Sequence, residues 1–357
     1  STTLFTTSSM WSEIIGVVFL INAFAVRAQE NVTDIPEENV DISEVDENGK
    51  ARNGIPLPPE IANIISPGNQ DCKTSTGKVG TCDWPSSCTT KGGIASGNCL
   101  GGLQVCCLIS KTCDSTTSYN NTYFVPDTTK QLDKCSIQII KPSADVCQIR
   151  LEFDEFTLLD AENGLCKKHK FSVFGVQKVP DICGKNDGHH MILDVKSVDS
   201  PIVLMVASSE TTVRANHSIR IVHIPCADTA NLAPKNCLQY MTSPEGTIKP
   251  FNIMGTGSNL DYNICVKVPE GKRVCFDNCT PNTVPPPLGV FDEVCIKKFW
   301  LLPCLSKKTS ARSSCEHHKY CGRALREPHC SNDPNGRFRV VSQGATVQGD
   351  CFKYTLD

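Results

Sequence analysis

The stretch CSIQIIKPSADVCQIRLEF at residues 135–153 alternates apolar and polar side chains. In a β-strand every second side chain points to the same face, so each alternating run predicts a strand with one buried face. The apolar members of the two runs are Ile137, Ile139, Ile149, Leu151 and Phe153.

The pattern continues on the carboxyl side of this stretch. Phe171 and Val173 alternate, as do Ile219 and Ile221. Residues 202–206 are continuously apolar, which is typical of a strand covered on both faces. Such segments separated by turns predict an antiparallel β-sandwich over residues 113–226.

Residues 237–357 repeat this pattern with less order. The alternating apolar positions are Ile264, Val266, Val268, Phe338, Val340, Phe352, Tyr354 and Leu356. A second, divergent sandwich is predicted there, and its last strand runs so close to residue 357 that the sequence leaves open whether the chain is a fragment. The predicted fold class is therefore mainly β.

The 22 cysteines are the strongest compositional signal. Thiols at this density persist as disulfides only in an oxidising compartment. Zinc fingers are the alternative, but no two Cys-x-x-Cys pairs occur and no histidine follows at finger spacing. We therefore expect disulfides.

The amino-terminal part predicts export. An apolar run at residues 14–25 precedes a small-residue cleavage site after Ala28, so residues 1–28 are predicted to be a signal peptide; an uncleaved anchor is the alternative. Residues 29–71 are a disordered acidic linker, because self-repelling carboxylates and missing aromatics prevent a core. A solvated tether is favoured there over a propeptide or interaction arm. No other segment could cross a membrane.

Residues 72–107 contain six cysteines and many glycines. A unit this small has almost no core, so crosslinks must hold it together.

Two function classes are disfavoured. The net charge is -3 and no local run of Lys and Arg supplies a nucleic-acid surface. The chain lacks an H-E-x-x-H motif and a Gly-Asp-Ser-Gly nucleophile, and an even cysteine count leaves no obvious free thiolate. We predict no catalytic residues, no cofactor and no enzyme activity.

Short motifs in residues 113–226 resemble the CUB domain, a β-sandwich family. They are similar to an arthropod subgroup of secreted CUB proteins in particular, and the resemblance covers most of residues 72–357. The motifs are NTYF at 121–124, CQIRL at 147–151, CGKN at 183–186, GHHM at 188–191 and CLQY at 237–240.

The resemblance implies specific disulfides. In the first CUB-like domain they join Cys113 to Cys135, Cys166 to Cys183, and Cys147 to Cys226. In the second they join Cys237 to Cys265 and Cys295 to Cys321. No partner can be assigned to Cys275, Cys279, Cys304, Cys315, Cys330 and Cys351.

The 72–107 module resembles a clip domain in its cysteine spacing and its Cys-Cys ending. That resemblance implies the pairs Cys72–Cys106, Cys82–Cys99 and Cys88–Cys107.

Many CUB domains bind calcium through acidic loop residues. The family's aspartate position is held here by His169 in the first domain and by Lys298 in the second, although Glu162 and Glu210 lie near other ligand positions. Lysine is no ligand for calcium and histidine is a poor one, so we predict no metal site. The histidine pairs 189–190 and 317–318 are interpreted as surface or loop residues rather than zinc ligands.

Four Asn-x-Ser/Thr triplets begin at Asn31, Asn120, Asn216 and Asn278. In an exported chain these are candidate glycan acceptors, with Asn278 doubtful because Cys279 follows it.

The function predicted is a secreted, extracellular, non-enzymatic adaptor that binds proteins or glycans, with no nucleic-acid partner and no membrane span after signal removal. The clip-like module could dock an extracellular protease cascade. The alternative is a structural protein of the extracellular matrix or cuticle, which the lack of low-complexity repeats disfavours.

Overall fold

The structure is a computed structural model, and it describes residues 70–129, 133–177, 179–210, 213–252, 259–279, 290–291, 295–296, 298–321, 325, 327–334, 336–342 and 351–357. The predicted signal peptide, the linker up to residue 69 and Asn31 lie outside the described residues. The chain divides into two units, Ser1–Leu108 and Ile109–Asp357.

In the first unit, short strands surround a group of disulfides. The elements are β1 (Asp71–Lys73), β2 (Val79–Asp83), α3 (Pro85–Thr90), β3 (Gly93–Cys99), η3 (Leu100–Gly102) and β4 (Gln104–Lys111). Strand β2 pairs antiparallel with β1 and with β4. A Cβ at Gly80 would lie 2.6 Å from the backbone oxygen of Cys107, so this close strand contact requires glycine.

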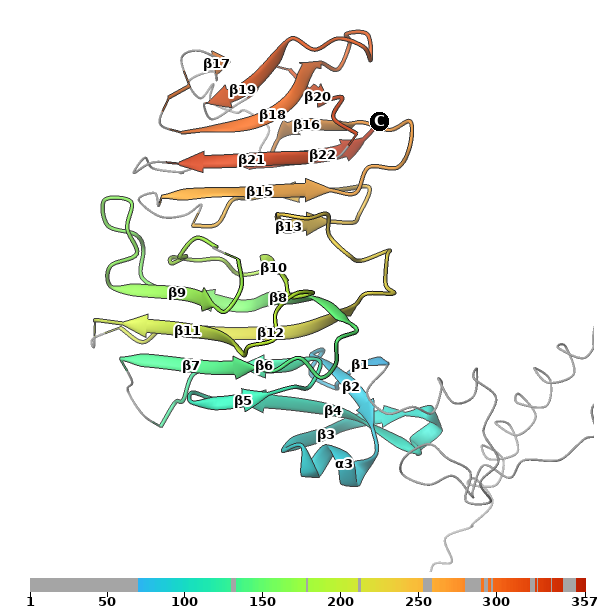
Figure 1. Ribbon diagram of the computed structural model, residues 1–357, viewed down its shortest axis with the longest axis vertical. Helices are drawn as coiled ribbons and strands as arrows, with labels where there is room; N and C mark the ends of the chain where they lie inside the picture. The colour runs from blue at the N-terminus through green and yellow to red at the C-terminus, as the bar shows by residue number, and fades with distance from the viewer. Residues whose placement is uncertain are drawn as a thin grey trace, which may run out of the picture. The chain divides into compact units, whose positions relative to one another are not determined.

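The second unit begins with a sandwich of two sheets, here called the first sandwich (Figure 1). One sheet has the order β6 (Thr122–Phe124), β12 (Asn216–Pro225), β8 (Val146–Thr157), β10 (His190–Asp194). The other has the order β5 (Ser115–Thr117), β7 (Lys134–Ile139), β11 (Ile202–Ser208), β9 (His169–Phe174). The alternating apolar residues of these strands face inward, and Ile137, Ile149 and Phe171 are fully buried.

The continuous apolar run of β11 differs from the prediction of a strand covered on both faces. Ile202, Leu204 and Val206 are buried, whereas Val203 and Met205 are half-buried. The two sets alternate because they lie on opposite faces of the sheet, and only the inner face packs into the sandwich core.

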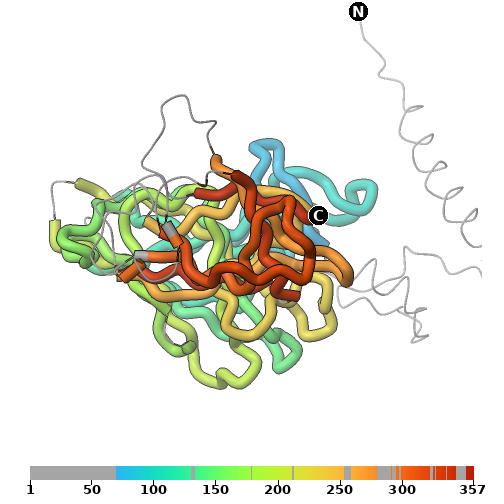
Figure 2. Tube along the Cα trace, turned by 90° about the horizontal axis from the view of Figure 1, so that it is seen from above, coloured from blue at the N-terminus to red at the C-terminus, as the bar shows by residue number. Residues whose placement is uncertain are grey.

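The second sandwich is built from ten strands in one continuous hydrogen-bonded sheet. Its elements are β13 (Cys237–Met241), β14 (Glu245–Ile248), β15 (Leu260–Val266), β16 (Val274–Asn278), β17 (Val290–Phe291), β18 (Lys298–Lys307), β19 (His317–Cys321), β20 (His329–Ser331), β21 (Arg337–Ser342) and β22 (Phe352–Leu356). Figure 2, viewed from above, shows it in front of the first sandwich.

This sheet folds back on itself. Strands β21 and β16 are separated by β18 and β20, which would place them about 14 Å apart in a flat sheet. The rings of Phe338 on β21 and Phe276 on β16 are nevertheless only 4.9 Å apart. Strand β18 makes the turn, pairing with β21 before Pro303 and with β20 after Cys304, whose φ is 54°.

The predicted fold class, mainly β with sandwich domains, is confirmed. The expectation of wholly antiparallel sandwiches is corrected, because β5 pairs with β7, and β13 with β15, in parallel. Among the described residues, no helix is long and apolar enough to span a membrane.

Candidate functional site

The outer face of the β5-β7-β11-β9 sheet carries apolar side chains. Val203 and Met205 lie on the outward side of β11, and Val203 is paired with Phe174 at the end of β9. Phe174 is 49% exposed, and Ile140, just after β7, is 45% exposed. We call Ile140, Phe174, Val203 and Met205 the apolar outer row.

A cavity of about 380 Å³ adjoins this row. Ile140, Val198 and Pro201 supply apolar wall, while Lys141 and Lys196 add positive charge. The ammonium of Lys141 donates a hydrogen bond to the carbonyl oxygen of Val195 at 2.8 Å, which holds one of these lysines in place. Partly exposed apolar residues beside a polar-edged hollow are typical of a protein-binding surface.

The loop between β8 and β9, which contains Glu162, also carries an exposed cation, Lys168. The Lys168 ammonium lies 2.9 Å from a carboxylate oxygen of Glu162. Hydrogen bonding and charge from Glu162, with a further contribution from the Glu210 charge, raise the pKa of Lys168. Of the two carboxylates noted in the sequence, Glu162 is thus paired with a lysine next to His169, and Glu210 adds a weaker attraction.

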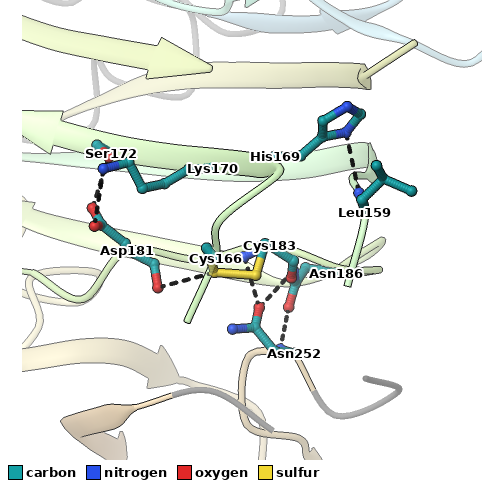
Figure 3. Close-up of a disulfide and its surroundings, with 9 residues drawn as sticks. All are labelled: Leu159, Cys166, His169, Lys170, Ser172, Asp181, Cys183, Asn186 and Asn252. Carbon is teal, nitrogen blue, oxygen red and sulfur yellow. Dashed lines mark hydrogen bonds and ion pairs between the residues drawn. A yellow bond between two sulfur atoms is a disulfide. The ribbon is translucent and has the colours of Figure 1, made fainter. Parts of the chain in front are cut away.

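His169 has a structural contact in this loop. Its Nδ1 accepts a hydrogen bond from the Leu159 backbone N–H at 3.1 Å, and the side chain is buried (Figure 3). Burial lowers the pKa of His169, which favours the neutral ring that can accept this bond. Lys298 lies at the start of β18, where its backbone pairs with that of Ser342 in β21.

A buried asparagine pair joins the two sandwiches. The Asn186 Oδ1 accepts a hydrogen bond from the Asn252 backbone N–H at 2.7 Å, and the Asn252 Oδ1 accepts one from the Cys183 backbone N–H at 3.0 Å (Figure 3). The ring of Phe251, the residue before Asn252, lies with its centroid 5.7 Å from that of the His189 ring. The apolar core continues across this joint.

His189, in the loop before β10, and His190 are both buried, which corrects their interpretation as surface residues. His190 starts β10, and its Nε2 accepts a hydrogen bond from the Tyr240 backbone N–H at 2.7 Å. Burial lowers the pKa of His190 well below its usual value. His317 and His318 lie on β19 rather than in a loop. His317 stacks on Phe291 with ring centroids 4.1 Å apart, and His318 is exposed at the surface.

The structure places the cysteines as follows. Those of the first unit are joined as Cys72–Cys106, Cys82–Cys99 and Cys88–Cys107. The first sandwich has Cys113–Cys135, Cys147–Cys226 and Cys166–Cys183. The second has Cys237–Cys265, Cys295–Cys321, Cys275–Cys330, Cys279–Cys351 and Cys304–Cys315, the last three of which the sequence could not assign.

Two groups of side chains that can ligate metals come close together in the described part of the chain. They are Cys72, Cys82 and Cys99, and Cys275, Cys330 and Asp357. All five cysteines are in disulfides, and the thiolate rather than the disulfide is the metal ligand.

The three described sequons differ in how their amides are used. Asn216 is exposed at the start of β12. The Asn120 Oδ1 accepts the His223 backbone N–H at 2.8 Å. The Asn278 amide bonds with both the carbonyl oxygen and the N–H of Leu325.

Two features of this region went unrecognised in the sequence. The outer row had a signal, the continuous apolar run of β11, which was interpreted as burial on both sides. No sequence signal pointed to the joint between Asn186 and Asn252, because the two residues are 66 positions apart in the chain.

Comparison with solved structures gives low-identity matches. The CUB1-EGF-CUB2 domains of rat MASP-1 match at 11% identity over 68% of this chain and 99% of that chain, with a TM-score of 0.26. The corresponding domains of human MASP-1/3 match at 12% identity, 66% and 98% coverage and a TM-score of 0.24. The extracellular region of zebrafish Gpr126/Adgrg6 matches at 12% identity, 69% and 34% coverage and a TM-score of 0.28. TM-scores this low carry no argument about this chain.

No curated protein matches the sequence. Residues 234–357 match the family model described as the animal CUB domain. This range includes β13 to β22, the strands of the second sandwich. The second of the two sandwiches is therefore a CUB domain.

Proposed function

We propose that this chain is a secreted, non-catalytic adaptor that binds an extracellular protein through the apolar outer row of its first sandwich. The observation that carries the proposal is the match of residues 234–357 to the CUB domain, a module that typically mediates extracellular protein interactions. The disulfides throughout the described part suit an oxidising compartment.

The outer row supports the choice of binding face. Val203 and Met205 belong to a run apolar enough for a strand covered on both faces, yet one face is covered by the sandwich core and the other is half-exposed. A partner on the outer face would bury these side chains with Phe174 and Ile140. Aromatic residues and methionine are enriched in such interfaces.

Binding through this sandwich is proposed to need no calcium. The Lys168 ammonium already compensates the charge of Glu162, with which it forms an ion pair, and His169 is engaged by the Leu159 backbone. His169 stands at the position where the family's calcium site would require an oxygen ligand.

The first sandwich is proposed to be CUB-like as well, and the 72–107 module to be clip-like and to dock a protease of an extracellular cascade. The motifs NTYF and CQIRL and the cysteine spacing support these assignments. The resemblance points to an arthropod source.

The test uses the full chain, expressed in secretory cells and purified from the medium. Partners are captured from extracellular fluid, identified, purified and titrated against the wild-type chain and Met205→Lys. Thr355→Lys is the matched control, because Thr355 is exposed on β22 of the second sandwich and is not part of the outer row. We expect Met205→Lys to weaken binding and the control to leave it unchanged, with and without chelator.

Three results would overturn the proposal. If Met205→Lys and the control variant bind the partner equally well, the outer row is not the binding face. Recovery of the chain mainly in insoluble matrix would favour the structural alternative. Hydrolysis of a substrate by the pure chain would contradict the non-catalytic role.

A further inference from the structure

A second hollow lies beside the one that adjoins the apolar outer row. Its volume is about 640 Å³, and it is lined by residues of β8, of the turn after β10 and of the segment that leads from β12 to β13. The two hollows share Lys196 and Val198 as lining residues. We call the larger one the lysine hollow and the smaller one the apolar hollow. Because they adjoin, one bound chain segment can occupy both.

Two lysines supply the positive charge of the lysine hollow. Lys196 comes from the turn after β10 and Lys235 from the segment before β13, and both are exposed. Neither ammonium forms an ion pair or a hydrogen bond with a described residue. The carboxylate in the lining, Asp194, accepts a hydrogen bond from the Lys196 backbone N–H at 3.2 Å. Both ammoniums are therefore available to an anionic ligand.

Further positive charge comes from the second sandwich. Arg337 donates a hydrogen bond to the carbonyl oxygen of Lys235 at 3.2 Å, and the Lys267 ammonium donates one to the carbonyl oxygen of Ala230 at 3.0 Å. The Asp228 carboxylate in the same segment accepts hydrogen bonds from within that segment. The cations that line the lysine hollow or bind its segment thus outnumber these carboxylates, and the resulting potential favours an anionic ligand.

The segment that carries Lys235 is held by both sandwiches. The Gln148 amide on β8 forms two hydrogen bonds with the backbone of Ala233, at 2.8 and 2.9 Å. On the other side, the Asn263 amide on β15 donates to the Asn236 carbonyl oxygen at 3.1 Å. Because this backbone is fixed before a ligand arrives, binding has to order only the lysine side chains, which lowers the entropic cost of association.

The apolar hollow decides between two kinds of anionic ligand. Ile140, Val198 and Pro201 provide a wall for one aliphatic or aromatic side chain, while Lys141 and Asp199 in the same lining carry opposite charges. A sulfated polysaccharide has no apolar group for this wall. A peptide segment can place an apolar side chain there and carboxylates in the adjoining lysine hollow.

We propose that the partner of the first sandwich presents an acidic peptide segment, with one apolar side chain in the apolar hollow and its carboxylates against Lys196 and Lys235. The inference rests on the proposed function and specifies the chemistry of the partner. Opposite charges speed association and select against basic partners. Binding should weaken as salt is added, because the attraction of exposed ammoniums is screened.

The experiment uses the full chain from secretory cells and a display library of random short peptides. Enriched peptides are synthesised and titrated by fluorescence anisotropy against the wild-type chain, Lys196→Glu, Lys235→Glu and the double variant, at low and at high salt. Lys353→Glu is the matched control, because Lys353 is exposed on β22 of the second sandwich and undergoes the same charge reversal. Thermal unfolding verifies that each variant is folded.

We expect the enriched peptides to combine Asp or Glu with an aliphatic or aromatic residue and to compete with the captured partner. Each single variant should weaken peptide binding about tenfold, and the double variant more, whereas Lys353→Glu should bind like the wild type. Replacing the contacting carboxylate of the peptide by lysine should restore affinity for Lys196→Glu or Lys235→Glu. A purely structural role of these lysines would not produce this rescue.

The inference is wrong if the enriched peptides lack acidic residues, or if the double variant binds them as the wild type does. It is also wrong if a sulfated polysaccharide displaces the captured partner and the acidic peptides do not. In these cases the proposed function stands as long as Met205→Lys weakens binding of the partner. If the lysine variants weaken binding and Met205→Lys does not, the acidic segment is supported and the outer row is no longer the binding face.

Discussion

The side chain of Asn186 in the first sandwich accepts the backbone N–H of Asn252 in the second at 2.7 Å. The Asn252 side chain in turn accepts the Cys183 N–H, next to the Cys166–Cys183 disulfide. Both asparagines are almost completely buried. Because buried polar groups are costly when unpaired, this reciprocal pairing makes the joint specific to one arrangement of the two sandwiches.

Removal of either side chain is expected to destabilise the joint. Asn186→Ala leaves the Asn252 N–H buried without its acceptor and should reduce the free energy of unfolding by about 2 kcal/mol. Asn252→Gly, chosen because the φ of Asn252 is 60°, should cost a similar amount. The double variant should cost less than the sum, since each change removes the same contacts.

Chemical denaturation of the wild-type chain, the two single variants and the double variant gives the four free energies of unfolding for this comparison. Asn263→Ala is the control, because the Asn263 amide bonds to Asn236 at the surface and its removal should change stability by no more than about 0.5 kcal/mol. Strict additivity of the two core changes would refute the coupling.

The alternation in the sequence predicted the strands well, because period-2 burial is a local property of the chain. Ile137, Ile149 and Phe171 all face the core as expected. The joint could not be predicted in this way, since Asn186 and Asn252 meet only after both sandwiches have formed. The partners of Cys275, Cys279 and Cys304 also depend on how the sheet folds at Pro303.

Buried histidines should make the stability depend on pH. Burial lowers the pKa of His217 and of His223 to about 4 in the folded chain, against a usual value of 6.5. Between these values the unfolded chain binds protons that the folded chain does not, so stability is full above pH 6.5 and falls as the pH drops toward 4. Each histidine should contribute a loss of about 1.4 kcal/mol per pH unit.

The measurement is the free energy of unfolding between pH 7 and pH 5. His223→Gln should make this profile less steep, whereas His318→Gln should leave it unchanged, because His318 is exposed on β19. A wild-type profile that is flat over this range would show that these rings are protonated in the folded chain too.

Calcium should not stabilise the wild-type chain, because Lys168 already forms an ion pair with Glu162. Lys168→Gln removes the ammonium that both Glu162 and Glu210 attract, but His169 still occupies the position of the central carboxylate, so we expect no rise in Tm with added calcium for this variant either. Thermal unfolding with calcium and with chelator provides the test, and Lys167→Gln, the exposed neighbour, is the control. A calcium-dependent Tm in the wild-type protein would show that the lysine does not replace the ion.

A non-reducing peptide map is expected to recover the cysteine pairs of the structure. The most informative peptides contain the adjacent residues Cys106 and Cys107, which the structure joins to Cys72 and Cys88 respectively. Proteases cannot easily separate neighbouring cysteines, so fragmentation of the linked peptide in the mass spectrometer is needed to assign each bond.

The peptide linking Cys275 to Cys330 tests the folding of the sheet of the second sandwich, because these residues lie opposite each other on β16 and β20. Links from Cys106 to Cys88 and from Cys107 to Cys72 would contradict the structure of the first unit, but would not bear on the sheet of the second sandwich. Many free thiols would contradict both the disulfide scheme and the proposed secretion.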